Sequence, residues 1–112
     1  IDWAIEHRGL YNIRVINLSL GGPVLQSYRD DPMCEAVERA VDAGIVVVAA
    51  GGNYGWSADG KVVWASITSP GNDPKAITVG ALDTHDTPER SDDHTCHCAI
   101  CAGSAWKLAG YF

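Results

Sequence analysis

IVVVAAGGN, residues 45–53, is the stretch of this chain that decides its expected fold. Its continuous β-branched run is typical of a strand covered on both faces, as in a parallel sheet. Gly51 and Gly52 then allow backbone angles and close approaches that a side chain would forbid. Asn53 follows this turn on a rigid edge, where its carboxamide is suited to stabilise a developing oxyanion. The alternative interpretation is an ordinary strand-to-loop turn that ends in a turn-favouring asparagine.

A helix is predicted directly before this strand. Asp31 is expected to cap it and Pro32 to occupy its first position, with Gly44 closing it. Apolar residues at helical spacing predict one buried face: Met33, Ala36, Val37, Ala40 and Val41. Because the first strand is expected at residues 11–20, the order strand, helix, strand predicts a right-handed βαβ unit.

Three further elements complete the expected fold. Asp2 to Arg8 is predicted to form the C-terminal part of a helix, and Gly9 is predicted to stop it. A turn is expected at residues 70–74, and a third strand at residues 76–81. The fold class is therefore α/β, a partial doubly wound parallel sheet with flanking helices.

Two more blocks stand in register with the first: Asn17-Leu18-Ser19-Leu20-Gly21-Gly22-Pro23, and Thr-Ser-Pro-Gly-Asn-Asp-Pro at residues 68–74. In this order and spacing, the three blocks resemble the subtilisin-like serine peptidases, the subtilases, from Ile1 to Asp93. Arg-Ser-Asp-Asp at residues 90–93 adds a likeness to bacterial members. The resemblance implies an internal fragment of a subtilase catalytic domain at residues 1–93, followed by a Cys/His-rich, non-family tail at residues 94–112.

The resemblance also implies roles for particular residues. Asn53 matches the oxyanion-hole asparagine, and Thr68 matches the floor of the S1 pocket of an enzyme that cleaves peptide substrates. The two walls of that pocket match Ser19, Leu20 and Gly21 on one side and Ala50, Gly51 and Gly52 on the other. Where the family usually has alanine this chain has Gly51, which predicts a more flexible wall. A weakly bound Ca²⁺ or Na⁺ is implied at the carbonyls of Gly71, Asp73 and Ala76.

A Ser-His-Asp mechanism needs a nucleophile, a base and an orienting acid. The family's aspartate, His-Gly-Thr and Gly-Thr-Ser-Met-Ala motifs do not occur in this sequence. Ser104 lacks the nucleophile motif and a predicted helix start behind it, so it is not a convincing substitute. The four histidines stand in non-family positions: His7, His85, His94 and His97. The chain alone is therefore predicted to be inactive as a protease, and residual hydrolysis by non-family groups around Asn53 is an alternative.

Cysteine and histidine are concentrated after Asp93. The cluster consists of His94, Cys96, His97, Cys98 and Cys101. Such soft ligands suit Zn²⁺ or Cu(I), but structural zinc sites usually have two ligand pairs separated by a longer loop. Three interpretations stay open: an out-of-frame or vector-derived tail, a metal site in a small self-associating protein, or disulfide and thiol chemistry. Cys34, by contrast, is expected to be a packed, unreactive thiol.

Composition sets the remaining limits. The 112 residues suit one modest domain, and a hydrophobic content of 46% excludes a disordered chain. A net charge of −6 with scattered Lys and Arg argues against a nucleic-acid partner. No apolar run approaches the roughly twenty residues that span a membrane. Sheet edges and faces left open by the missing strands predict a homo-oligomer. The compartment is undetermined, because a bacterial parent could be secreted or cytoplasmic.

Overall fold

The computed structural model describes residues 1–54, 57, 59, 61, 63, 66–83, 87–92, 94–96 and 108–111. Within these residues the elements follow the order α1 (Asp2–Tyr11), β1 (Val15–Leu18), α2 (Pro32–Asp42), β2 (Val46–Ala50), β3 (Ile77–Asp83), β4 (His94–Cys96) and β5 (Leu108–Tyr111). None of the helices in this described part is long and apolar enough to cross a membrane.

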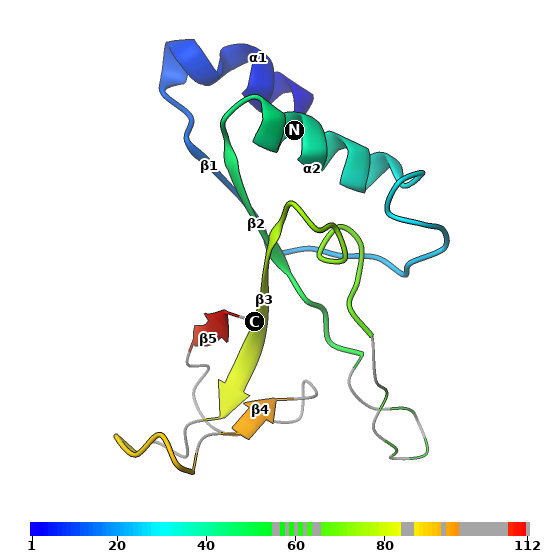
Figure 1. The fold of residues 1–112 in the computed structure, drawn as a ribbon, viewed down its shortest axis with the longest axis vertical. Coiled ribbons are helices and arrows are strands. Elements are labelled where there is room, and N and C mark those ends of the chain that lie inside the picture. Colours follow the sequence, from blue (N-terminus) through cyan, green and yellow to red (C-terminus); the bar gives the residue numbers. More distant parts are fainter. Residues whose placement is uncertain are drawn as a thin grey trace.

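Strands β1, β2 and β3 lie side by side and parallel (Figure 1). Leu18 of β1 is in register with Ala49 of β2, and Ala50 of β2 is in register with Val79 of β3. Strands β4 and β5 both pair with β3 in the antiparallel direction. The predicted α/β class, a partial parallel sheet with flanking helices, is confirmed.

Helix α2 begins where its sequence predicts, but Met33, expected on its buried face, is 39% exposed, and Cys34 is buried instead. Asp31 Oδ1 accepts hydrogen bonds from the backbone N–H of Met33 at 2.8 Å and of Cys34 at 3.4 Å, and Pro32 is the first helical residue. The chain then turns at Gly44, whose positive φ of 85° suits a residue without a Cβ. The helix therefore begins at the predicted cap and ends before the predicted glycine.

The core lies between α2 and the sheet. Its fully or almost fully buried members are Val37, Ala40, Ile45 and Val47. Ile5 of α1 packs against this same cluster, and α1 itself packs on α2. Both helices therefore cover the same side of the strands, at the upper end of the view in Figure 1.

The expectation that β2 is covered on both faces is wrong for the described part of the chain. Val47 and Ala49 are buried, whereas Val46 is 46% exposed and Val15 beside it in register is 57% exposed. Burial thus alternates along β2 because α2 covers one face only. A continuous β-branched run cannot by itself indicate whether a second layer is present.

Helix α1 continues through the residue that was expected to stop it. Gly9 lies inside the helix, and the left-handed conformation that ends it belongs to Asn12, at φ 53° and ψ 42°. Asparagine tolerates this conformation better than most residues, and its Oδ1 accepts a hydrogen bond from Arg14 Nε at 2.8 Å. The stop predicted at Gly9 is therefore wrong, and the first strand begins later than residue 11 because Tyr11 is still helical.

Substitution of Gly9 by alanine is expected to stabilise the protein by about 0.5–1 kcal/mol. Glycine costs roughly this amount in a helix interior, and a Cβ at Gly9 would meet no atom within 4 Å. Urea denaturation of both proteins measures the difference. A loss of stability in G9A would show that this turn is not helical in solution.

Candidate functional site

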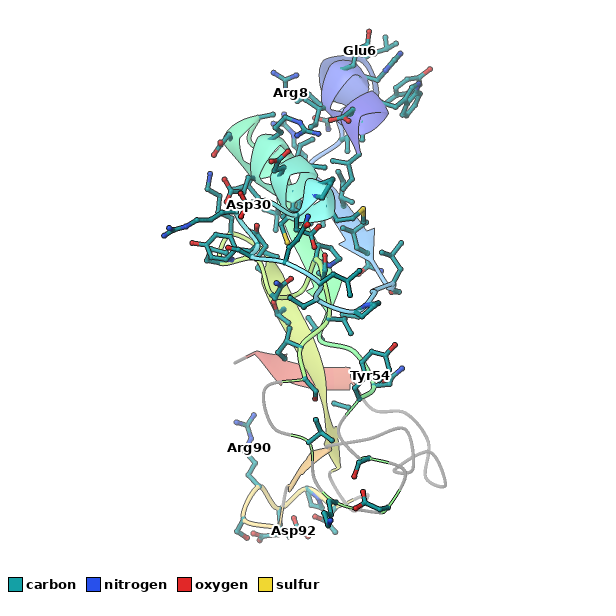
Figure 2. The ribbon with its side chains drawn as sticks, turned by 90° about the vertical axis from the view of Figure 1, so that its right-hand side faces the viewer. Glu6, Arg8, Asp30, Tyr54, Arg90 and Asp92 are labelled. Carbon is teal, nitrogen blue, oxygen red and sulfur yellow. The ribbon has the colours of Figure 1, made fainter. Side chains whose placement is uncertain are left out.

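The segments that follow β1 and β2 leave the sheet at the same end, where both parallel strands have their carboxyl termini. Since Leu18 is in register with Ala49, residues 19–21 and residues 50–53 continue from neighbouring parallel strands. Open α/β sheets place their sites at such carboxyl ends. Figure 2 shows Tyr54, the residue after Asn53, in the lower half of the view, well away from Glu6 and Arg8 of α1 at the top. The structure thus brings residues 19–21 and residues 50–53 to the same end of the parallel strands.

Thr68 lies between these two segments. A Cβ on Gly21 would clash with Thr68 Oγ1, and a Cβ on Gly52 would lie 2.5 Å from Thr68 Cγ2. Gly52 also has a positive φ of 99°, which disfavours any residue with a side chain. Thr68 itself is only 3% exposed. Glycine at both positions is therefore what allows the two segments to approach one threonine.

Backbone hydrogen bonds fix this contact. The Thr68 N–H donates to the Gly51 carbonyl at 2.9 Å, and the Gly51 N–H donates to the Val79 carbonyl at 2.8 Å. Gly22 and Ser69 exchange a pair of hydrogen bonds, from Gly22 N to Ser69 O at 2.9 Å and from Ser69 N to Gly22 O at 3.0 Å. We call residues 19–22, 50–53 and 68–69 the three-segment edge. Main-chain hydrogen bonds thus join residues 68–69 to each of the other two segments.

Solvent reaches this edge from one side. Leu20 is 51% exposed, and Ser19, Gly52 and Asn53 are exposed beside it. Gly51 and Thr68 are buried beneath them. The Ser19 hydroxyl accepts a hydrogen bond from Asn17 Nδ2 at 3.0 Å. The arrangement is an open strip of main chain and small side chains above a buried floor, with one exposed carboxamide.

Two contacts of this edge have no counterpart in the sequence-based analysis. Cys34 of α2 is fully buried, its Sγ lies 3.9 Å from Ser69 Oγ, and its thiol donates to Asn72 Oδ1 at 3.5 Å. The Gly22–Ser69 bridge is the other. Nothing in the sequence indicated these two contacts, except that Gly22 lies in the block of residues 17–23 and Ser69 in the block of residues 68–74. Helix α2 therefore supports the floor of the edge from below.

Cys34 is expected to resist alkylation until the protein unfolds. Burial raises the pKa of its thiol, which lowers the fraction of reactive thiolate, and the side chain is closed to solvent. Iodoacetamide labelling at pH 8, read by mass spectrometry of the peptide that contains Cys34, should be at least about a hundredfold slower in buffer than in urea, as local opening that costs a few kcal/mol requires. Equal rates would mean that α2 does not pack on Ser69.

The loop implied to bind a cation contains mostly satisfied carbonyls. The Gly71 carbonyl accepts from the Thr78 hydroxyl, and the Asp73 carbonyl accepts from Ala76 N at 3.2 Å. The Asp73 side chain is buried, with Oδ1 accepting from Lys75 N at 2.8 Å and Oδ2 without a partner among the described residues. Burial raises the pKa of this carboxyl above its usual value. The cation site at the Gly71, Asp73 and Ala76 carbonyls stays a prediction.

The structure describes only part of the predicted metal cluster in the tail. By backbone register, His94 pairs with Asp83 and Cys96 pairs with Ala81. His97, Cys98, Cys101, Ser104 and His85 lie outside the described residues. In the part of the chain that is described, no group of three or more His, Cys, Asp or Glu residues is placed to hold a metal ion. The zinc site therefore also stays a prediction.

Comparison with known proteins identifies the family. Residues 1–97 match the model of the subtilase family. The chain belongs to the subtilase family. This subtilase chain is 39% identical over 102 residues to the serine protease AprX of Bacillus subtilis (strain 168), an alignment that covers 83% of the chain and 21% of AprX.

Other subtilases give the same result. Identity to subtilisin E of Bacillus subtilis (strain 168) is 38% over 84 residues, covering 75% of the chain and 19% of that protein. Identity to the subtilisin-like proteinase Mp1 of Magnaporthiopsis poae is 40% over 85 residues, covering 73% of the chain and 18% of the relative. The chain thus spans about a fifth of the length of these curated relatives.

Proposed function

We propose that this subtilase chain supplies the substrate-binding edge and one oxyanion donor of a serine endopeptidase cleft. The observation that best supports this proposal is the meeting of Gly21 and Gly52 on Thr68. Three segments far apart in the sequence form one open strip, and its exposed side holds the Asn53 carboxamide. Family membership makes a peptide the substrate to test first.

The chemistry follows from the arrangement of main-chain groups. Residues 19–21 extend beyond β1, so an extended peptide can pair with their backbone as an added strand. Its P1 side chain then lies between residues 19–21 and residues 50–52, above Thr68. The Asn53 amide donates to the carbonyl oxygen of the scissile bond as negative charge develops there. The nucleophile, the base and the orienting acid of the reaction lie outside this constellation.

Peptide binding to the isotope-labelled chain tests the proposal. We expect acetyl-Ala-Ala-Pro-Ala-amide to shift the NMR signals of residues 19–21 and 50–53 and to leave those of α1 unchanged. A peptide with the same side chains but N-methylated backbone amides is the matched control, and it should bind weakly because it cannot complete the strand pairing. Shifts confined to α1, or equal binding of both peptides, would refute the assignment.

We also propose that the chain forms a homo-oligomer through β1. Among the described residues β1 pairs only with β2, and Val15 and Val46 are exposed on the uncovered face. An open strand edge beside an apolar surface favours pairing with a second chain. Sedimentation equilibrium should therefore give a species at least twice the 11.9 kDa protomer. Val15→Lys should shift it toward the monomer, whereas a monomeric wild type at tens of micromolar would contradict the proposal.

We further propose three features that the sequence predicts. A boundary at Asp93 should make residues 94–112 dispensable for the fold of residues 1–93, which limited proteolysis and NMR can test. Zinc at His94, Cys96, His97, Cys98 and Cys101 should appear in metal analysis of the purified chain. The alternative to an inactive chain, hydrolysis by non-family groups around Asn53, would be recognised as activity that persists in a serine-directed inhibitor.

A further inference from the structure

We infer that Cys34 of α2 positions residues 19–22 for peptide binding, acting through Ser69 and Asn72. The inference rests on the proposed function, because it concerns how the three-segment edge is held in shape. It adds a residue that lies outside this edge, on the helix beneath it. Cys34 touches no substrate in this arrangement, so it is a positioning residue.

The place of the Cys34 thiol is fixed by the start of α2. Asp31 Oδ1 accepts a hydrogen bond from the Cys34 N–H at 3.4 Å, and Cys34 itself is fully buried. One turn further along the helix, Val37 is buried in the core. A helix cap before Cys34 and a packed core residue after it therefore leave the sulfur little freedom to move.

The thiol links two side chains of the turn that follows Thr68. Its Sγ lies 3.9 Å from Ser69 Oγ and 3.5 Å from Asn72 Oδ1. The Asn72 oxygen can only accept, so the thiol proton is donated to it. Burial raises the pKa of the Cys34 thiol, which keeps this proton in place at neutral pH. Because the thiol has a single proton, the Ser69 hydroxyl is the donor in the other contact.

Ser69 and Asn72 pass this constraint on to the edge. Ser69 exchanges two main-chain hydrogen bonds with Gly22, of 2.9 and 3.0 Å, and the Asn72 N–H donates to the Thr68 carbonyl at 3.1 Å. Residues 19–22 begin at the end of β1, so the sheet holds them at one end and Ser69 holds them at the other. The alignment of this segment with the rest of the edge thus depends on where α2 holds Ser69.

Peptide binding is sensitive to this alignment. An extended peptide would pair with the main chain of residues 19–21 while Asn53 reaches its carbonyl oxygen, so the two contacts need one fixed spacing. Loss of the thiol would leave the Asn72 side-chain oxygen without this donor and the Ser69 hydroxyl without this acceptor. The segment could then shift, and part of the binding free energy would be lost in ordering it again.

Two substitutions at Cys34 test the role, in NMR titrations of the full chain with acetyl-Ala-Ala-Pro-Ala-amide. Cys34→Ala removes both hydrogen bonds and should weaken peptide binding about threefold to tenfold, the usual value of such contacts. Cys34→Ser keeps a donor and an acceptor at the same place and should bind within about twofold of the wild type. Amide hydrogen exchange at Gly22 and Ser69 should quicken in Cys34→Ala but not in Cys34→Ser, because only the first loosens their bridge.

Val37→Ala is the matched control for a loss of packing. Val37 lies one turn from Cys34 in the same helix and is equally buried, but it belongs to the core between α2 and the sheet. Its truncation should lower the urea midpoint of unfolding more than Cys34→Ala does, because it removes a larger buried group. The peptide affinity of the folded Val37→Ala chain should nevertheless equal that of the wild type. If α2 acted only through overall stability, this variant would bind least tightly.

Three results would overturn the inference: wild-type affinity in Cys34→Ala, no recovery of affinity in Cys34→Ser, or equal weakening by Val37→Ala. If Cys34→Ala does not fold, Ser69→Ala decides, because it removes the donor to Sγ from the other side and should weaken binding about threefold.

Failure of the proposed function would look different. A wild type in which the peptide shifts no signal of residues 19–21 would refute the proposed function and this inference together. If the wild type binds the peptide there and Cys34→Ala binds it equally well, the substrate-binding assignment stands and only the role of Cys34 is wrong.

Discussion

The purified 112-residue chain is expected to hydrolyse casein and peptide nitroanilides no faster than a mock preparation. Its sequence contains neither the His-Gly-Thr nor the Gly-Thr-Ser-Met-Ala motif of the family. In subtilisin, a relative of this chain, removal of the triad costs on the order of a millionfold in turnover. The oxyanion and binding groups that remain there supply a residual rate only about 10³- to 10⁴-fold above water. The Asn53 edge alone should therefore give no measurable proteolysis.

Inhibitors distinguish the outcomes of this experiment. Hydrolysis above the mock that a serine-directed fluorophosphonate abolishes would mean that a serine of this chain acts as a nucleophile, and the prediction would be wrong. Hydrolysis that a chelator abolishes would point to metal chemistry in the tail. An Asn53→Ala variant is the matched control, because a rate that passes through the proposed oxyanion donor must fall with it.

A large loss of stability is expected when Gly52 is replaced by alanine. The φ of 99° costs a residue with a side chain about 1–2 kcal/mol, and overpacking against Thr68 Cγ2 adds about 1–3 kcal/mol. We therefore expect G52A to lower the free energy of unfolding by about 3 kcal/mol in urea denaturation. The effect should also abolish peptide binding, because Thr68 and residues 50–53 would have to separate.

Gly22→Ala is the control for this experiment. Gly22 lies in the same edge and keeps its backbone bonds to Ser69, but its Cβ would meet no atom within 4 Å and its φ is not positive. It should change stability by less than about 0.5 kcal/mol. Similar losses of stability in both variants would show that any side chain at these glycine positions is destabilising, whether or not it contacts Thr68.

Local signals account for what could be predicted of the fold. The residues that mark the ends of α2 lie next to it in the sequence: Asp31 and Pro32 at its start and Gly44 after its end. The helix begins and ends beside them. The end of α1 was harder to predict because two residues compete for it. Gly9 has the intrinsic preference, but the ring of Tyr11 stacks on that of Trp3 at 5.6 Å between centroids, and Asn12 closes a longer helix. The preference of glycine for helix C-termini takes no account of such side-chain stacking, so it misplaced the end of α1.

Tertiary contacts explain the rest. The exposure of Val46 depends on whether a second layer covers β2, which no property of the strand itself reveals. For the site, the blocks around Ser19, Asn53 and Thr68 could be identified from the sequence. The contact of Thr68 with two glycines could not, because it joins three segments that are distant in the chain. The support from Cys34 was missed for the same reason.

The most direct measurement is a crystal structure of the chain with an extended Ala-Ala-Pro-Ala peptide bound. The central claim predicts that the peptide backbone runs beside residues 19–21 and that its P1 methyl group rests above Thr68. The P1 carbonyl oxygen should lie about 2.9 Å from Asn53 Nδ2, the usual length of an N–H···O hydrogen bond. A peptide bound along another surface, or one whose P1 carbonyl points away from Asn53, would contradict it.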